Sequence, residues 1–235
     1  MQLFYNALIS KDTLNFIFDR EESKHIIKVL RKQANDILLV TNGLGILFHT
    51  KITLASDSKC TVEIVGFEEK TAPTFKIHLA VAPTKMNERY EWFLEKATEI
   101  GVLEITPIIC DHSERKILKS ERFEKLLITA MKQSNQCFAP KLNPAILFKD
   151  FVTKKHDAQK FIAHCEETDK ISLKSCIKPN ENVLILIGPE GDFSEKEIKF
   201  AIENNFKAVT LGNTRLRTET AAIVACHSVI FVNEI

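Results

Sequence analysis

The sequence predicts an α/β protein with two domains: a small, mostly β domain at residues 1–72 and a larger domain with a parallel sheet at residues 73–235. Up to residue 66, short apolar segments alternate with turn residues, a pattern typical of paired strands. Beyond Pro73, apolar strand-like segments alternate with helical ones, as in a parallel sheet covered by helices. A chain of 235 residues, 45% of them hydrophobic, can bury two cores of ordinary size.

The composition narrows the possible functions. Lysine and arginine (32) nearly balance aspartate and glutamate (31), so any RNA-binding site must be a local patch of positive charge. No apolar stretch approaches the roughly 20 residues that span a bilayer, and the first residues lack the order of a signal peptide. These features predict a cytoplasmic protein that binds no membrane. The six cysteines contain no C-x-x-C pair, which argues against zinc and disulfides, so we expect no metal.

The first domain is expected to consist of short strands around one helix. The apolar segment 36–40 reads as a strand, and the Asn42-Gly43 pair that follows it is typical of a tight turn. Segments 46–54 and 60–66 continue the strand pattern. Residues 22–30 have apolar positions at helical spacing. A charged stretch followed by a proline then predicts an exposed linker, which places the domain boundary near residue 72.

The second domain alternates strands and helices. Asn87 is expected to cap a helix that ends at Gly101, and residues 123–131 carry the apolar stripe of another helix. The last helix, 221–232, is almost wholly apolar and is expected to be buried, with His227 as a core residue. The expected strands are 77–81, 105–109, 161–165, 183–187 and 208–211.

The strongest functional signal lies at the end of strand 183–187. A glycine-bearing turn, Gly188-Pro189-Glu190-Gly191-Asp192-Phe193, leads directly into a helix that Ser194 and Glu197 start with a capping box. Ligands of open α/β sheets bind at the carboxyl ends of strands, where glycines let a flat ligand approach the main chain. The alternative is an ordinary strand-to-helix turn.

A second loop of the same kind follows strand 208–211. It runs from Thr210 to Thr220 and carries Arg215, Arg217 and Glu219 at the start of an apolar helix. Charges beside a buried helix need a partner, because an unpaired buried charge is costly. The loop is therefore either part of a binding site or a capping and salt-bridge cluster, in which Glu219 favours the helix N-terminus.

Two further strand ends carry polar candidates. Lys85 follows strand 77–81 and would join the other loops if that strand is central; the alternative is a solvated loop lysine. His164 ends strand 161–165, either as a ligand contact or in a surface turn. No P-loop, dinucleotide fingerprint or G-x-S-x-G elbow is present, so the usual support for ATP hydrolysis, hydride transfer and α/β-hydrolase chemistry is missing.

Taken together, these motifs closely resemble the bacterial small-subunit ribosomal RNA methyltransferase E family of the SPOUT superfamily. The resemblance rests first on 187–191 with Phe193-Ser194, then on Leu211-Gly212 and 216–221, in this order before a terminal apolar helix. It extends over essentially the whole chain, through Lys28-Val29-Leu30-Arg31, Asn42-Gly43, 96–102, 133–135 and Pro140.

The resemblance implies an RNA-binding, PUA-like domain at 1–72 and a SPOUT methyltransferase domain with a deep trefoil knot at 73–235. Periodicity alone could not predict the knot, because knots are essentially absent from ordinary folds. The resemblance also implies a homodimer that uses S-adenosylmethionine to methylate N3 of a uridine in 16S ribosomal RNA, within an assembled or assembling small subunit.

It also implies roles for particular residues. Arg217, with Arg215 as a second donor, would stabilise negative charge on the uracil oxygens, and Glu219 would orient the arginine or act as the base. The cofactor-binding residues would be Ile187, Gly188, Pro189, Glu190, Gly191, Leu211, Gly212, Leu216, Thr218 and Thr220. The RNA-binding residues would be Lys28, Arg31, Lys85, Arg115 and Lys132.

Four positions depart from the family pattern. Asn35 and Asp192 stand where glycine is usual, and Lys132 and Gln136 stand where glutamate and arginine are common. These departures leave two alternatives open. One is a non-catalytic RNA-binding protein. The other is a SPOUT methyltransferase that acts on another RNA, although such an enzyme would not explain the match of the first domain.

Overall fold

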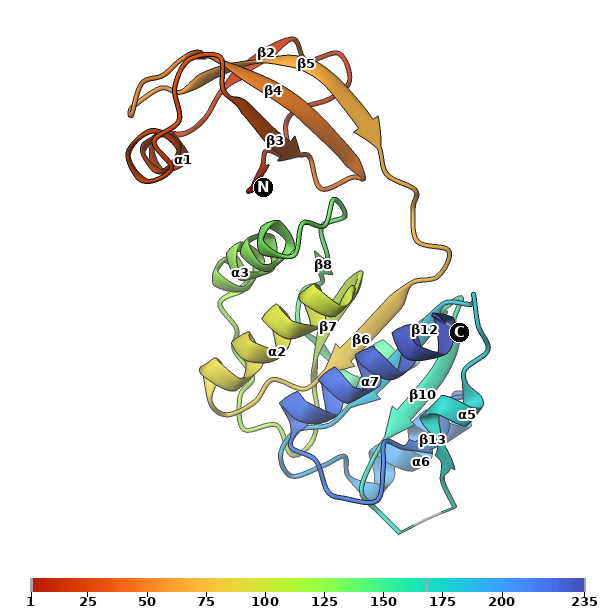
Figure 1. Cartoon of the computed structure of the whole chain (residues 1–235). Helices are drawn as coiled ribbons and strands as arrows, with labels where there is room; N and C mark the ends of the chain where they lie inside the picture. The colour runs from red at the N-terminus through yellow and green to blue at the C-terminus, as the bar shows by residue number, and fades with distance from the viewer. Residues whose placement is uncertain (1, 168, 235) are drawn as a thin grey trace. The chain divides into compact units, whose positions relative to one another are not determined.

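A computed structural model describes residues 2–167 and 169–234, which form two compact units (Figure 1). The first unit extends to Ala72 and includes Met131–Ala139; the second comprises Pro73–Ala130 and the chain from Pro140 onward. The segment Met131–Ala139 joins the first unit through backbone hydrogen bonds: the Gly45 amide donates to the Cys137 carbonyl at 2.8 Å, and the Ala139 amide donates to the Gly43 carbonyl at 2.8 Å. The division predicted from the sequence assigned this segment to the second domain.

The first unit contains a five-stranded sheet in the order β1-β3-β4-β5-β2, in which β1 and β3 are parallel and the other pairs are antiparallel. Its core gathers apolar side chains such as Phe4, Ile26, Val40 and Phe48. The small, mostly β first domain expected from the sequence is therefore confirmed. The strands are β1 (Leu3–Tyr5), β2 (Asn15–Ile17), β3 (Ile37–Thr41), β4 (Ile46–Leu54) and β5 (Thr61–Glu69).

The helical segment predicted at 22–30 is present, but it changes from an α-helix to a π-helical turn. Helix α1 (Arg20–Lys24) starts at Asp19, whose carboxylate accepts the Glu22 amide at 2.8 Å, and continues as a π-helical turn η1 (His25–Val29). The Glu22 side chain also meets Lys132, with 2.5 Å between Oε1 and Nζ. Glu22 therefore ties segment 131–139 to α1 within the first unit.

The predicted turn at Asn42-Gly43 joins the antiparallel pair β3 and β4. The Asn42 side chain accepts the Leu44 amide at 2.9 Å, and Gly43 and Gly45 take left-handed φ angles of 76° and 89°. A side chain on Gly45 would overlap the ring of Phe138. Both the backbone conformation and the space at this position therefore require glycine.

Gly45→Ala should lower the free energy of unfolding by about 2 kcal/mol or more, because left-handed strain and overpacking against Phe138 act together. Gly66→Ala is the matched control, since Gly66 lies in β5 and a Cβ there would meet no other atom of the described residues within 4 Å. Its effect should stay within about 1 kcal/mol. Urea denaturation followed by circular dichroism measures the free energy of unfolding of both variants. Equal losses for Gly45→Ala and Gly66→Ala would contradict the requirement for glycine at position 45.

The second unit contains an 8-stranded sheet whose main order is β11-β13-β10-β12-β6-β7-β8, with β9 beside β7, and all of its recorded pairings are parallel. The predicted parallel α/β architecture is thus confirmed. The strands are β6 (Ile77–Val81), β7 (Glu104–Ile109), β8 (Lys141–Leu142), β9 (Ile146–Leu147), β10 (Gln159–Ala163), β11 (Ile171–Ser172), β12 (Val183–Ile187) and β13 (Lys207–Thr210).

Helices cover both faces of this sheet, which explains the continuous apolar sequence of β12. Val183, Ile185 and Ile187 face one core, which α2 and α7 cover, whereas Leu184 and Leu186 face a second core, which α4 and α6 cover. Strands buried on both faces need apolar residues at every position. The helices are α2 (Asn87–Ile100), α3 (Ser120–Gln133), α4 (Phe148–Val152), α5 (Leu173–Cys176), α6 (Glu195–Glu203) and α7 (Thr218–Asn233).

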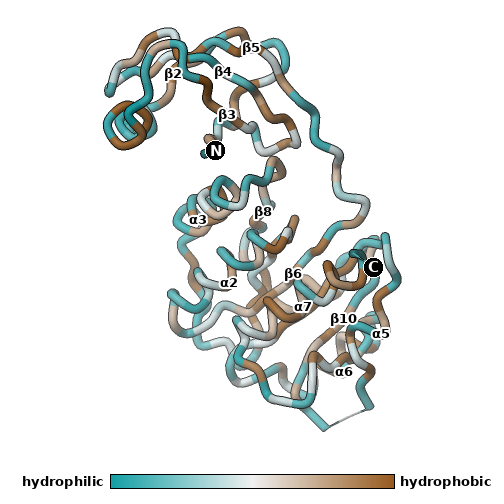
Figure 2. Tube along the Cα trace, in the orientation of Figure 1, coloured by the Kyte–Doolittle hydropathy of each residue, from teal (hydrophilic) through white to brown (hydrophobic). Residues whose placement is uncertain are grey.

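Two predictions about these helices were wrong. Asn87 does not cap α2: Met86 occupies the cap position, and the Asn87 side chain instead accepts a hydrogen bond from Arg115. Helix α7 is apolar over most of its length (Figure 2), but His227 is exposed rather than a core residue, and Phe231 is 47% exposed. Within the described chain, no helix has the length and apolar character needed to cross a membrane.

Candidate functional site

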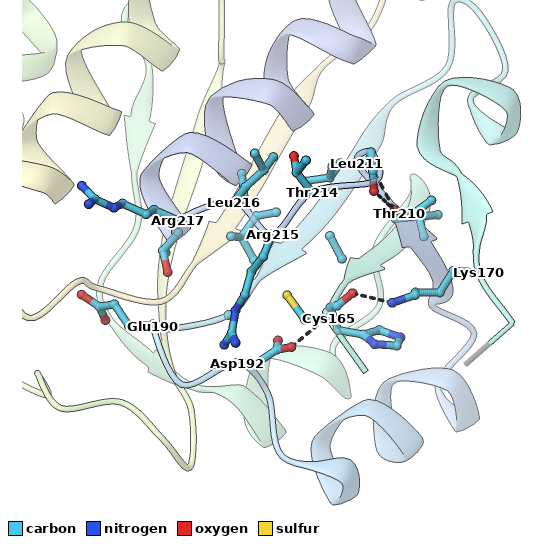
Figure 3. Close-up of a pocket in the computed structure, with 18 of the residues that line it drawn as sticks. Cys165, Lys170, Glu190, Asp192, Thr210, Leu211, Thr214, Arg215, Leu216 and Arg217 are labelled. Atoms are coloured by element: carbon cyan, nitrogen blue, oxygen red, sulfur yellow. Dashed lines mark hydrogen bonds between the residues drawn. The ribbon is translucent and has the colours of Figure 1, made fainter. Parts of the chain in front are cut away.

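Three loops at the carboxyl edge of the second sheet enclose a cavity of about 510 Å³ (Figure 3). Strands β12, β10 and β13 are parallel neighbours, so the loops that follow them meet at this edge. The volume lies within the roughly 300–1,000 Å³ of small-molecule pockets. The loops contribute residues 163–165 with Lys170, 187–190 with Asp192, and 209–218.

The loop after β12 is tightly constrained. A side chain on Gly188 would come within 3.1 Å of the Phe193 ring and of the Phe193 backbone nitrogen. The predicted capping box of α6 is present: the Glu197 amide donates to the Ser194 hydroxyl at 3.3 Å, and the Ser194 amide donates to the Glu197 carboxylate at 2.9 Å. Phe193 thus occupies the space that a side chain at position 188 would need, and the box fixes where the loop ends.

Asp192 joins two loops of the cavity. Its φ of 62° lies in the left-handed region, which aspartate tolerates better than most residues. Its carboxylate accepts the Cys165 amide at 2.6 Å and the Phe193 amide at 2.8 Å (Figure 3). The aspartate therefore supplies a link from the β12 loop to the β10 loop that glycine cannot make.

His164, in the β10 loop, lines the cavity and is only 7% exposed. The Lys170 ammonium donates to the His164 carbonyl at 3.0 Å and to the Glu166 carbonyl at 2.6 Å. Burial lowers the pKa of the imidazole, and the charge of Lys170 acts in the same direction. Of the two sequence-based alternatives for His164, the surface turn is therefore wrong.

The loop after β13 carries the two arginines. The Thr210 hydroxyl donates to the Gly212 carbonyl at 2.7 Å, and Arg217 stands at the start of α7, with its carbonyl accepting the Ala221 amide at 2.8 Å. Both arginine side chains are exposed and line the cavity. Figure 3 shows Arg215 extending toward the loop of Glu190 and Asp192, whereas Arg217 extends away from Cys165 and Lys170.

Most of the cofactor-binding residues expected from the sequence line this one cavity. They are Ile187, Gly188, Pro189, Glu190, Leu211, Gly212, Leu216 and Thr218. Gly191, Thr220 and Glu219 do not belong to the described lining: the Gly191 carbonyl is 3.0 Å from the His112 ring nitrogen Nδ1, and the other two lie in the first turn of α7. The β10 loop was largely missed, although the strand-end argument applies to it equally.

Glu219 is buried beside a basic residue rather than in the cavity. Only 6% of it is exposed, and Oε1 lies 3.9 Å from Nε of Arg89. Its other oxygen, Oε2, has no hydrogen-bond partner among the described residues. Its place in the first turn of α7 puts a negative charge where the helix dipole favours it.

Lys85 and Arg115 lie at the edge where β6 and β7 end. The Lys85 amide donates to the Glu190 carboxylate at 2.9 Å, so this third strand end meets the β12 loop, as expected for a central strand. Both side chains have partners. The Lys85 ammonium lies 2.8 Å from Glu114, and Arg115 donates to the Lys85 carbonyl at 2.8 Å and to Asn87.

The other three predicted RNA-binding residues lie in the first unit. Lys28 is exposed and lies 3.3 Å from Asp57, an ion pair that solvent screens strongly. Arg31 is also exposed and has a left-handed φ of 54°. Lys132 is the most enclosed of the three, because its side chain is 24% exposed and contacts Glu22.

A second cavity, of about 640 Å³, lies at the opposite, amino edge of the sheet. Its buried polar side chains satisfy one another: His78 and Thr106 are 2.8 Å apart, and Asn143 donates to Glu104 at 2.6 Å. Burial lowers the pKa of His78 to about 4, so this histidine is neutral at pH 7. These groups form a closed network that stabilises the sheet edge.

The comparisons with known proteins agree with this geometry. A family model described as an RNA methyltransferase domain matches residues 70–230, and one described as an RNA methyltransferase PUA domain matches residues 18–65. Ribosomal RNA small subunit methyltransferase E of Buchnera aphidicola is 32% identical over 225 residues, which cover 91% of this chain and 87% of the relative.

Solved structures show the same fold. A probable rRNA-methyltransferase from Porphyromonas gingivalis superposes with a TM-score of 0.94 at 39% identity, covering 100% of this chain and 99% of the other. Ribosomal RNA small subunit methyltransferase E from Neisseria gonorrhoeae, solved bound to S-adenosyl methionine, gives 0.85 at 26% identity, covering 99% and 98%.

The two family models, which match a chain with a strand-end cavity in its parallel sheet, place it among the RNA methyltransferases that carry a PUA domain. The chain belongs to the ribosomal RNA small subunit methyltransferase E family. The family predicted from the motifs is confirmed, as is the SPOUT-like α/β domain preceded by a PUA-like domain.

Substitutions of Asp192 should separate the effect of its left-handed backbone from the effect of its two carboxylate hydrogen bonds. Asp192→Ala should cost about 3 kcal/mol of unfolding free energy, because it combines left-handed strain with the loss of two hydrogen bonds to a charged group. Asp192→Gly should cost less, since it loses the bonds without the strain. Asp192→Asn should also cost less than alanine, since asparagine tolerates the left-handed conformation and its single side-chain oxygen keeps one of the two bonds. Thermal denaturation compares the three variants, and equal effects for all of them would contradict the combined contribution of strain and hydrogen bonds.

Proposed function

We propose that this protein transfers the methyl group of S-adenosylmethionine to N3 of a uridine in 16S ribosomal RNA of the small subunit. The observation that carries the proposal is the cavity of about 510 Å³ between three strand-end loops, in a chain of the ribosomal RNA small subunit methyltransferase E family. Closely similar structures bind S-adenosyl methionine.

The residues present fit this cofactor. The wall at Gly188 is main chain, so a flat group can approach it, while Ile187, Leu211 and Leu216 supply apolar contacts for a nucleoside. The two ring nitrogens of His164, unpaired within the described chain, offer hydrogen bonds to a polar ligand. No metal is needed, since methyl transfer from a sulfonium is an in-line displacement that depends mainly on positioning.

When bound, the cofactor would supply an electrophilic methyl group, and the chain's residues would prepare the uracil. N3 carries a proton, so its loss places negative charge on the neighbouring carbonyl oxygens. The Arg217 guanidinium, at the cavity rim, is the donor that we propose stabilises this charge, with Arg215 as second donor. Glu219 lies buried near Arg89 and outside the lining, which favours a positioning role over that of the base.

The uridine must be unpaired to present N3, which lies on its Watson–Crick edge. The first unit, which matches a PUA domain, is the proposed grip on the surrounding RNA. Lys28, Arg31 and Lys85 are the best placed of the predicted RNA-binding residues, because all three are exposed and the ion pairs of the two lysines are open to solvent. Arg115 and Lys132 are only partly exposed and hold contacts that they would have to exchange for phosphate.

We also propose that the protein is a cytoplasmic homodimer with the deep trefoil knot implied by the family resemblance. Trp92 on α2 and Phe231 on α7 are 45% and 47% exposed, and apolar side chains of this size are candidates for cover by a second copy. Size-exclusion chromatography with light scattering should give twice the 26.7 kDa chain mass. A mass equal to one chain at micromolar concentration would rule out a stable dimer.

Purified protein with S-adenosylmethionine should form 3-methyluridine in small ribosomal subunits that lack it, as detected by nucleoside mass spectrometry. Arg217→Ala should lower kcat by about 100-fold or more, because one lost donor to developing charge costs this much. The control is Arg122→Ala, an exposed arginine of α3 that pairs with Glu91.

The other functions predict different results. A non-catalytic RNA-binding protein would show no thermal shift with S-adenosylhomocysteine, since only a ligand that binds the folded state raises its stability. Methylation of transfer RNA instead of ribosomal RNA would favour another SPOUT specificity. Full activity of Arg217→Ala would remove that arginine from the mechanism.

A further inference from the structure

The imidazole of His164 is a buried polar group to which the proposed function assigns neither a chemical step nor a particular part of the cofactor. His164 directly follows β10, the strand between β12 and β13, and its side chain belongs to the cavity lining. With 7% of the residue exposed, the ring is almost fully removed from bulk solvent. It is therefore placed at the centre of the loop edge on which the cofactor pocket is built.

Neither ring nitrogen of His164 has a hydrogen-bond partner within residues 2–167 and 169–234. Buried polar atoms are nearly always hydrogen-bonded, because leaving one unpaired is costly. The nearby charged groups serve other atoms: Lys170 donates to two carbonyl oxygens, and the Asp192 carboxylate accepts two amides. A buried, unpaired imidazole facing a cavity is a feature that a bound ligand would satisfy.

We infer that His164 hydrogen-bonds the nucleoside half of S-adenosylmethionine, through a ribose hydroxyl or a nitrogen of adenine. The inference rests on the proposed function. A neutral imidazole presents one N–H donor and one acceptor. Ribose hydroxyls and the adenine edge offer the same uncharged combination, whereas the amino-acid half carries an ammonium and a carboxylate, which a charged side chain would bind better.

The protonation state and the backbone both suit this role. Burial and the charge of Lys170 lower the pKa of His164, so the ring is neutral at pH 7. Its backbone is held on both sides: Lys170 binds the His164 carbonyl at 3.0 Å, and Asp192 binds the following amide, of Cys165, at 2.6 Å. A binding group fixed before the ligand arrives loses less entropy on binding.

The test compares two ligands by isothermal titration calorimetry: S-adenosylhomocysteine, and 5′-methylthioadenosine, which lacks the amino-acid end. His164→Phe should weaken the binding of both by about fivefold or more, equivalent to about 1 kcal/mol. The control is His227→Phe, which removes an exposed imidazole of α7 and should leave both affinities within about twofold. The ligand-free melting temperature of His164→Phe should not fall, because the variant removes two unpaired buried nitrogens.

Three outcomes would overturn the inference or its foundation. Unchanged affinity for both ligands would show that the imidazole only fills space. Weaker binding of S-adenosylhomocysteine alone would assign His164 to the amino-acid half. If the wild-type protein bound neither ligand, the proposed function itself would fail. Should His164→Phe not fold, His164→Asn tests the same affinities, with a loss for both ligands still required.

Discussion

The burial of β12 on both faces is the constraint on which the second unit depends. This strand has Val183, Ile185 and Ile187 in one core and Leu184 and Leu186 in the other, so every one of its side chains is held inside one of the two cores. Its parallel neighbours β6 and β10 must end at the same edge. The cavity follows from this arrangement, because the three loops can turn only where the buried strands stop.

Local sequence determined the elements that were predicted best. Strand Val183–Ile187 was placed to the residue, since an uninterrupted apolar run ends at a glycine, and the Ser194–Glu197 box lies within one helical turn. The His227 prediction failed because α7 is so rich in apolar residues that its sequence does not mark an exposed face. The fold class and the two main loops could therefore be predicted from the sequence, whereas the exposure of single side chains could not.

The parts of the site that escaped prediction depend on contacts between distant residues. In the sequence, Asp192 is only a departure from the expected motif, and its bond to the amide of Cys165, 27 positions earlier, explains what the side chain does. Arg115 stays a predicted RNA-binding residue, but nothing in the sequence indicated that its guanidinium donates to the Lys85 carbonyl, 30 positions away. Charge and spacing identify candidate residues. The order of the strands in the sheet determines which hydrogen-bond partner lies next to each of them.

The position of the segment Met131–Ala139 in the sequence limits how the two units can be separated. The segment belongs to the first unit, yet it runs from the last residues of α3 to just before β8, between two stretches of chain that build the second. A cut at residue 72 would therefore separate Cys137 and Ala139 from the Gly43–Gly45 turn that they hydrogen-bond. The PUA-like domain is not a removable module at one end of the chain, because its final piece is inserted in the sequence of the catalytic domain.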